Sequence, residues 1–141
     1  MQSKKISQNA KVSQRGGESV GKRRPQTPQN RVDAELRKLQ RITKDAIPKE
    51  RRDAALSLLP NIAFLKVKLD EARNELLYEK LFTEYDNGGG QSGLREHPGF
   101  SAYNKLFTTF ARAVKQLTDM MPSGSFAADA LTDYINETRT R

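Results

Sequence analysis

Apolar side chains recur at helical spacing along most of the chain, and the breaks between these runs divide it into segments. The first run contains Val32, Leu36 and Leu39, which repeat at intervals of four and three residues. This spacing predicts a helix over residues 31–47. Pro48 ends the helix, because the residue before a proline is displaced from the α region.

A second, short helix is expected over residues 49–59. Two short helices joined at a proline allow two interpretations. One is a DNA-binding helix-turn-helix, and the other is a pair of helices that pack on the core with Arg51 and Arg52 in solvent. The turn lacks its usual glycine, and the second helix is apolar toward its end rather than lined with base-reading side chains. The packing interpretation is therefore favoured.

Two longer helices are expected over residues 61–85 and 98–121, on either side of a glycine-rich break. Such a pair should fold back as an antiparallel hairpin. A last helix is expected over residues 126–138, and no alternating run long enough for a strand is visible. The chain is therefore predicted to be all-α. The positions expected in the core or between copies are Leu65, Leu69, Leu76, Phe100, Tyr103, Phe107, Phe110, Val114 and Leu117.

The aromatic residues are concentrated in the long hairpin and the last helix. All ten lie between Phe64 and Tyr134. A thin hairpin of roughly 60 residues cannot enclose so many rings by itself. Either the flanking helices wrap it or several copies pack together, and self-association as a homo-oligomer is the more economical expectation.

The positive charge is concentrated at the start of the chain. The 141 residues carry a formal charge of +8, and residues 1–30 hold seven basic groups and one acidic group, which is +6 of that total. This segment has no aromatic residue and is rich in Ser, Gln, Gly and Pro. It cannot bury enough apolar surface to offset the entropy of ordering. We therefore expect a disordered basic arm over 1–30 and a helical domain over 31–141.

Such an arm can contact phosphates, or it can be a solubilising tail without a partner of its own. The nucleic-acid interpretation is favoured because three of the basic groups are consecutive, at residues 22–24. The residues expected to contact DNA are Lys4, Lys5, Lys11, Arg15, Lys22, Arg23, Arg24, Arg31, Arg37, Lys38 and Arg41.

Several kinds of chemistry have no support in the sequence. The chain has no cysteine and one histidine, which argues against disulfide scaffolds, zinc ribbons and thiolate nucleophiles. The glycine-rich break has no following lysine and no P-loop spacing. We expect no enzyme activity, no cofactor and no metal. No apolar run reaches the roughly 18–20 residues of a membrane span, and no secretory signal is visible at the start, so no membrane partner is expected.

One motif is distinctive. Residues 93–98 read Gly-Leu-Arg-Glu-His-Pro and lead into a predicted helix with aromatic residues. The stretch from roughly residue 60 to 122 resembles the C-terminal part of tailed-phage terminase small subunits. In many of these a long helix leads to a glycine-containing loop, an Asn-Pro or His-Pro pair and a helix with aromatic and basic residues. The positions that carry the resemblance are Gly93, Arg95, Glu96, His97, Pro98 and Tyr103.

The resemblance implies a non-enzymatic subunit of a genome-packaging motor in the host cytoplasm. Such subunits form rings, bind double-stranded viral DNA and present it to the terminase large subunit, which holds the ATPase and the nuclease. The motif does not locate the DNA-binding surface. The alternative is a helical adaptor or structural protein whose basic tail binds an acidic protein partner.

Overall fold

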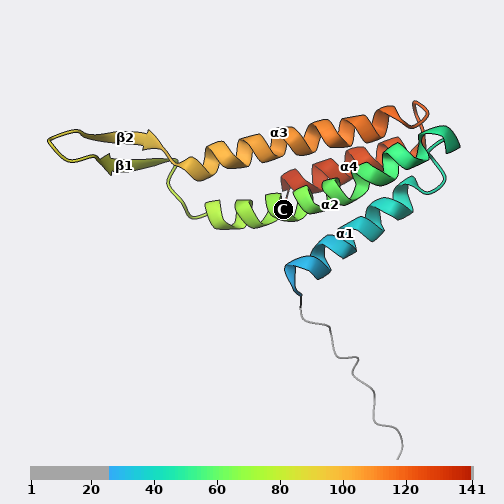
Figure 1. Ribbon diagram of the computed structural model, residues 1–141, viewed down its shortest axis with the longest axis horizontal. Coiled ribbons are helices and arrows are strands. Elements are labelled where there is room, and N and C mark those ends of the chain that lie inside the picture. The colour runs from blue at the N-terminus through green and yellow to red at the C-terminus, as the bar shows by residue number, and fades with distance from the viewer. Residues whose placement is uncertain (1–25, 141) are drawn as a thin grey trace, which may run out of the picture.

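The computed structural model describes residues 26–140, and side chains through residue 137. Four helices dominate this part of the chain and run up, down, up and down (Figure 1). A short antiparallel β-hairpin joins the second helix to the third. The elements are α1 (Pro28–Thr43), a 3₁₀ turn η1 (Lys49–Arg51), α2 (Arg52–Leu76), β1 (Phe82–Asp86), β2 (Ser92–Glu96), α3 (Pro98–Asp119) and α4 (Phe126–Thr140).

The four helices pack as a bundle at one end of the molecule. α1 packs on α2, α2 packs on α3, and α4 contacts both α3 and α1. The expected antiparallel pair of long helices is present as α2 and α3, of 25 and 22 residues. α1 and α4 have only 16 and 15 residues. The long pair therefore extends beyond the bundle and carries the β-hairpin at its far end (Figure 1).

The first helix begins earlier and ends earlier than predicted. α1 starts at Pro28, and its N-cap is Thr27, whose Oγ1 accepts the Asn30 N–H at 3.2 Å. The helix therefore includes Asn30, which lies before the predicted start at residue 31. The predicted boundary of the arm at residue 30 was also too late, because residues 28–30 are helical. The expectation of disorder for residues 1–25 lies outside the described part of the chain.

The predicted break between the short helix 49–59 and the helix 61–85 was wrong. α2 runs without interruption through Pro60, which lies on the exposed side of the helix. The missing N–H of Pro60 and the carbonyl that it leaves free are thus on the solvent side, where water can satisfy that carbonyl. The Asn61 side-chain amide also donates to the Ser57 carbonyl at 3.5 Å. A helix-turn-helix is not formed, since the second helix belongs to the long pair.

The prediction of no strand was also wrong, because α2 ends at Leu76 and residues 82–86 form β1. Apolar residues at 81, 82 and 85 fit a helical stripe, and only Leu81, Thr83 and Tyr85 keep the alternate spacing of one strand face. The turn that follows explains why this segment forms a hairpin instead of continuing the helix. Gly88, Gly89 and Gly90 all have positive φ, of 79°, 65° and 82°, which lets the chain reverse tightly enough for β2 to pair with β1.

The core is built by all four helices. The largest fully buried side chains are Leu39 of α1, Leu59, Ile62 and Leu69 of α2, Phe110, Val114 and Leu117 of α3, and Leu131 and Tyr134 of α4. Of the predicted core positions, Leu69, Phe110, Val114 and Leu117 are buried. Leu65, Tyr103 and Phe107 are partly buried against this core. Leu76 and Phe100 are half-buried toward the open end of the long pair. Flanking helices thus wrap one half of the predicted hairpin.

Tyr134 connects the two short helices through the centre of the bundle. Its side chain is 1% exposed, and its ring lies 6.2 Å from that of Phe110. Its hydroxyl donates to Glu35 Oε2 at 2.9 Å. Lys38 Nζ lies 5.2 Å from the centre of the same ring and forms an ion pair with Glu137 at 2.7 Å. One aromatic residue thereby joins α1, α3 and α4.

We expect Tyr134→Phe to lower the free energy of unfolding by about 1–2 kcal/mol, because Glu35 loses a hydrogen bond in a partly buried site. Tyr78→Phe is the matched control, since Tyr78 is 89% exposed. Urea unfolding followed by circular dichroism measures both variants. Equal stability changes in the two variants would contradict a structural role for the Tyr134 hydroxyl.

Stability should also fall at alkaline pH through Tyr134. Burial raises the pKa of its phenol above the ordinary value of 10.0, and the Glu35 carboxylate adds to this. The folded state therefore favours the neutral phenol, so this contribution is fully present below pH 10 and is lost as the pH rises above it. We expect unfolding free energy to decline more steeply between about pH 9 and about pH 11 in the unmodified chain than in Tyr134→Phe. Parallel declines would refute this.

Candidate nucleic-acid interface

A row of basic side chains lies along the outer face of α1. Arg37, Arg41 and Lys44 are spaced by four and three residues, which places them on one side of the helix. All three are exposed, and they line a groove of about 620 Å³ together with Ala34 and Gln40. Within the described residues none of the three has an acidic partner. The row therefore presents three cations that are available to a ligand.

The turn after α1 brings a second group of basic residues to the same end of the bundle. The turn η1 contains Lys49 and Arg51, and Arg52 begins α2. All three residues are exposed, as the packing interpretation predicted for both arginines. Arg51 Nη1 donates to the Asp119 carbonyl at 3.0 Å, so it also fastens the start of α2 to the end of α3. These side chains widen the basic surface beyond α1.

Two of the four predicted DNA contacts on the body of the protein are instead used inside the bundle. Arg31 forms an ion pair with Glu71 at 3.2 Å, and Lys38 forms one with Glu137 at 2.7 Å. Lys68 donates to Glu71 and holds the pKa of that carboxyl below its usual value, with a further contribution from the charge of Arg31. Only Arg37 and Arg41 of the predicted four are unpaired.

The seven predicted contacts in the arm, Lys4, Lys5, Lys11, Arg15, Lys22, Arg23 and Arg24, lie outside the described residues.

The sequence prediction missed Lys44 and Arg52 as members of the surface. The signal for Lys44 was present, because it continues the spacing set by Arg37 and Arg41. Arg52 comes close only because the chain reverses at Pro48, and both Lys44 and Arg52 line a further groove between α1 and α2. A long-range juxtaposition of this kind has no local signature in the sequence.

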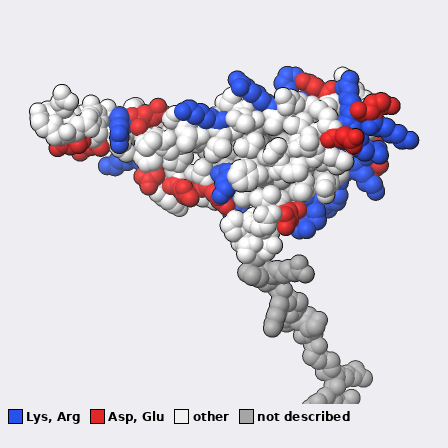
Figure 2. All heavy atoms as spheres, in the orientation of Figure 1, with Lys and Arg blue, Asp and Glu red and all other residues white. Residues whose placement is uncertain are grey.

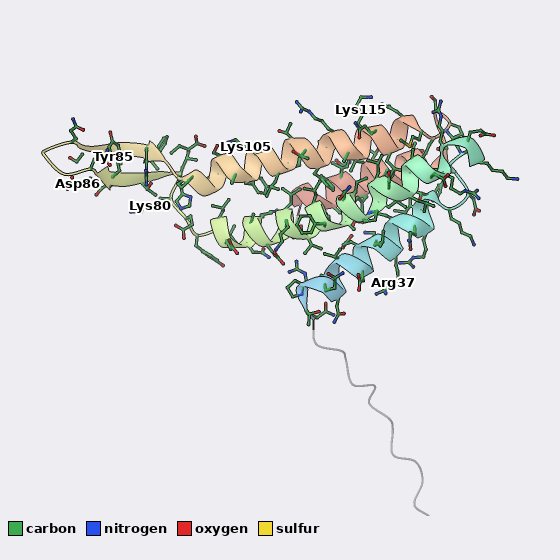
Figure 3. All side chains as sticks on the ribbon, viewed as in Figure 1. Arg37, Lys80, Tyr85, Asp86, Lys105 and Lys115 are labelled. Atoms are coloured by element: carbon green, nitrogen blue, oxygen red, sulfur yellow. The ribbon has the colours of Figure 1, made fainter. Side chains whose placement is uncertain are left out.

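Charge is segregated along the molecule. Residues 37–53, at the α1–α2 turn, contain seven basic and three acidic residues. Residues 75–96, from the end of α2 through the β-hairpin, contain two basic and five acidic residues. In Figure 2 the Lys and Arg side chains gather at the end opposite the hairpin. The sticks in Figure 3 show Arg37 pointing away from the bundle, whereas Tyr85 and Asp86 belong to the hairpin.

The Gly-Leu-Arg-Glu-His-Pro motif forms the junction between β2 and α3. Gly93 faces the Tyr85 ring, which a Cβ at this position would approach to 3.1 Å. His97 is the N-cap of α3, and its Nδ1 accepts the Gly99 N–H at 3.1 Å. Pro98 occupies the first turn, while Arg95 and Glu96 are exposed on β2. The motif shapes a strand-to-helix turn and adds no side chain to the basic row.

The surface is suited to binding phosphate groups. Arginine and lysine side chains without internal partners can displace counterions from a nucleic-acid backbone. In the part of the chain that the structure describes, no cluster of three or more His, Cys, Asp or Glu side chains could hold a metal ion. Within the same residues, no helix is long and apolar enough to cross a membrane.

Replacing Arg37 and Arg41 together by alanine should weaken binding to duplex DNA and make the plot of log K against log salt less steep by about 2, at roughly 0.9 per phosphate contact. The control is the pair Arg31→Ala and Lys38→Ala, which removes the same charge from residues held by Glu71 and Glu137. Fluorescence anisotropy at several salt concentrations measures both slopes. Equal changes in the two double variants would show that only net charge matters.

The comparisons with known proteins add no relative to this description. No family model, no curated protein and no solved structure matches the chain. The fold and the surface are therefore described from this chain alone, and the resemblance to terminase small subunits stays an expectation from the motif.

Proposed function

We propose that this protein is a non-enzymatic DNA-binding subunit of a phage genome-packaging machine, of the terminase small subunit type. It would bind double-stranded viral DNA as a ring-shaped oligomer, by resemblance to that family, and present the DNA to a large subunit with the ATPase and nuclease activities. The observation that carries the proposal is the unpaired basic row of Arg37, Arg41 and Lys44, on the helix that directly follows the arm with a charge of +6.

The position of the row supports a shared DNA contact with the arm. The three residues span about 10 Å along α1, at 1.5 Å per residue. Duplex DNA carries one negative charge per roughly 1.7 Å of its axis, so several phosphates lie within the reach of this row. Because the arm joins α1 at Pro28, its seven basic residues are tethered to the same helix as the row, which begins about 14 Å along that helix at Arg37, and this raises their local concentration near the row.

The acidic character of the hairpin end favours DNA contact at the opposite end. Five carboxylates between residues 75 and 96 would repel a phosphate backbone. A duplex that approaches the protein is therefore directed toward the α1–α2 turn. The same polarity orients every copy in an assembly in the same way relative to the DNA.

Removal of residues 1–25 tests the role of the arm. If the arm engages about five phosphates, the plot of log K against log salt should lose about 4 to 5 units of negative slope in the truncated chain. Self-association, measured by native mass spectrometry, should be unchanged, because residues 26–137 contain the whole described core. A slope that stays the same after truncation would exclude the arm as a DNA contact.

Competition between DNA substrates separates packaging from the adaptor alternative. A packaging subunit should prefer a segment of its own phage genome over random duplex of equal length, while an adaptor for acidic proteins should bind both equally. Anisotropy with labelled genomic DNA and unlabelled random competitor measures the preference at fixed salt.

A further inference from the structure

The two faces of the β-hairpin differ in their burial. β1 and β2 pair antiparallel, with Tyr85 opposite Gly93 and Thr83 opposite Arg95. On this face the Tyr85 ring lies across Gly93, and Thr83, Tyr85 and Gly93 are half-buried. The other face is formed by Phe82, Glu84, Asp86, Ser92, Leu94 and Glu96, all of which are exposed. We call these six residues the acidic hairpin face.

The acidic hairpin face combines apolar and acidic side chains. Phe82 is 54% exposed and Leu94 is 69% exposed, and each lies opposite a carboxylate, Glu96 and Glu84 respectively. The hairpin also stands clear of the helical bundle (Figure 1). A two-stranded hairpin without a packing partner is marginally stable in water. Its exposed apolar residues are therefore available for a contact outside this chain's own bundle.

The opposite end of the molecule carries a surface of complementary character. A groove of about 430 Å³ between α1 and the start of α2 is lined by the apolar side chains of Ile47, Leu56 and Leu59. The charged side chains of Lys44, Arg52 and Asp45 also line it and leave it with a net positive charge. Leu56 is 51% exposed, although its helix is central to the bundle. We call this the basic groove. Neither Lys44 nor Arg52 has an acidic partner among the described residues.

We infer that the acidic hairpin face of one copy docks into the basic groove of a second copy. Phe82 and Leu94 would cover the apolar wall, and the carboxylates of the hairpin would pair with Lys44 and Arg52. The two surfaces lie at opposite ends of one elongated chain (Figure 1), so a copy cannot satisfy its own groove. The two surfaces have opposite charge and both include apolar side chains, so we take the occupant to be a second copy of this chain.

Contact between two different surfaces is a head-to-tail contact. Such contacts propagate from copy to copy and close into a ring when the rotation between neighbours allows it. The inference thus deepens the proposed function, on which it rests for the purpose of the assembly. It leaves Arg37 and Arg41 of the basic row free for DNA, because these line the neighbouring groove on the outer face of α1, whereas Lys44 lines both grooves and would be used in the contact between copies.

A charge-reversal experiment tests the contact in full-length protein. The hairpin variant carries Glu84→Lys and Glu96→Lys, neither of which takes part in the turn. The groove variant carries Lys44→Glu and Arg52→Glu. Each variant alone would place like charges opposite each other, so its apparent dissociation constant for self-association should rise at least about tenfold. Sedimentation velocity measures the change, and circular dichroism checks that each variant is folded.

An equimolar mixture of the two variants should associate again. The basic hairpin of the first variant faces the acidic groove of the second, and the acidic hairpin of the second faces the basic groove of the first. A control with Asp129→Lys and Asp133→Lys makes the same charge change as the hairpin variant on the exposed side of α4 and should associate like the unmodified protein. Net charge alone cannot explain loss of association in both single variants, because the hairpin variant raises the net charge and the groove variant lowers it, so this loss together with rescue in the mixture is specific to the proposed pairing.

Three outcomes would overturn the inference: unchanged association of either single variant, no rescue in the mixture, or equal loss in the α4 control. Loss in the hairpin variant with normal association of the groove variant would indicate hairpin-to-hairpin contact instead. DNA binding is measured separately with Arg37→Ala and Arg41→Ala. Assembly by this contact without DNA binding would refute the proposed function alone, and DNA binding without this contact would refute the inference alone.

Discussion

The arrangement of the whole bundle depends on the burial of Tyr134 between three helices. Its ring packs on Phe110, its hydroxyl donates to Glu35 at 2.9 Å, and Lys38 lies over the ring while it pairs with Glu137. Isolated helices of the length of α1 and α4, 16 and 15 residues, are only marginally stable in water, so packing on the long pair, in which this contact takes part, stabilises them. It also fixes the rotation of α1. Because Glu35 and Lys38 face α4, Arg37 and Arg41 must face solvent.

The unequal lengths of the helices divide the molecule into two ends with different properties. α1 and α4 cover only the part of α2 and α3 that lies near the α1–α2 turn, and there the apolar side chains are buried. At the other end Leu77, Tyr78 and Leu81 remain exposed next to the hairpin. Five of the eight large hydrophobic residues that are exposed in the described chain lie between residues 77 and 94. A single copy thus completes its core at one end and leaves an unpartnered apolar surface at the other.

The helical part of this fold was predictable because its signal is local. The stripe through Phe110, Val114 and Leu117 has the helical period, and it forms the buried face of α3. The β-hairpin was missed because Leu81, Phe82 and Tyr85 fit a helical period, whereas Phe82 and Tyr85 lie on opposite faces of β1, and a turn of three glycines with positive φ closes the hairpin. The basic row was partly predictable from spacing. The sequence did not show that Arg31 and Lys38 form ion pairs, because their partners Glu71 and Glu137 lie 40 and 99 residues away along the chain.

The near-neutral net charge of residues 31–141 does not reveal that the two ends of the molecule differ in charge. The formal charges of residues 31–141 sum to only +2, and this sum alone would not indicate a phosphate-binding surface. Under the proposed function, segregation of that charge would allow one end to bind a polyanion while the other end repels it, and attraction between unlike ends would favour association in one orientation. In the proposed assembly each copy contributes a few exposed cations and one arm. Each of these contacts alone would bind DNA weakly. Linking the copies makes later DNA contacts effectively intramolecular, so the strength of binding comes from the assembly rather than from any one residue.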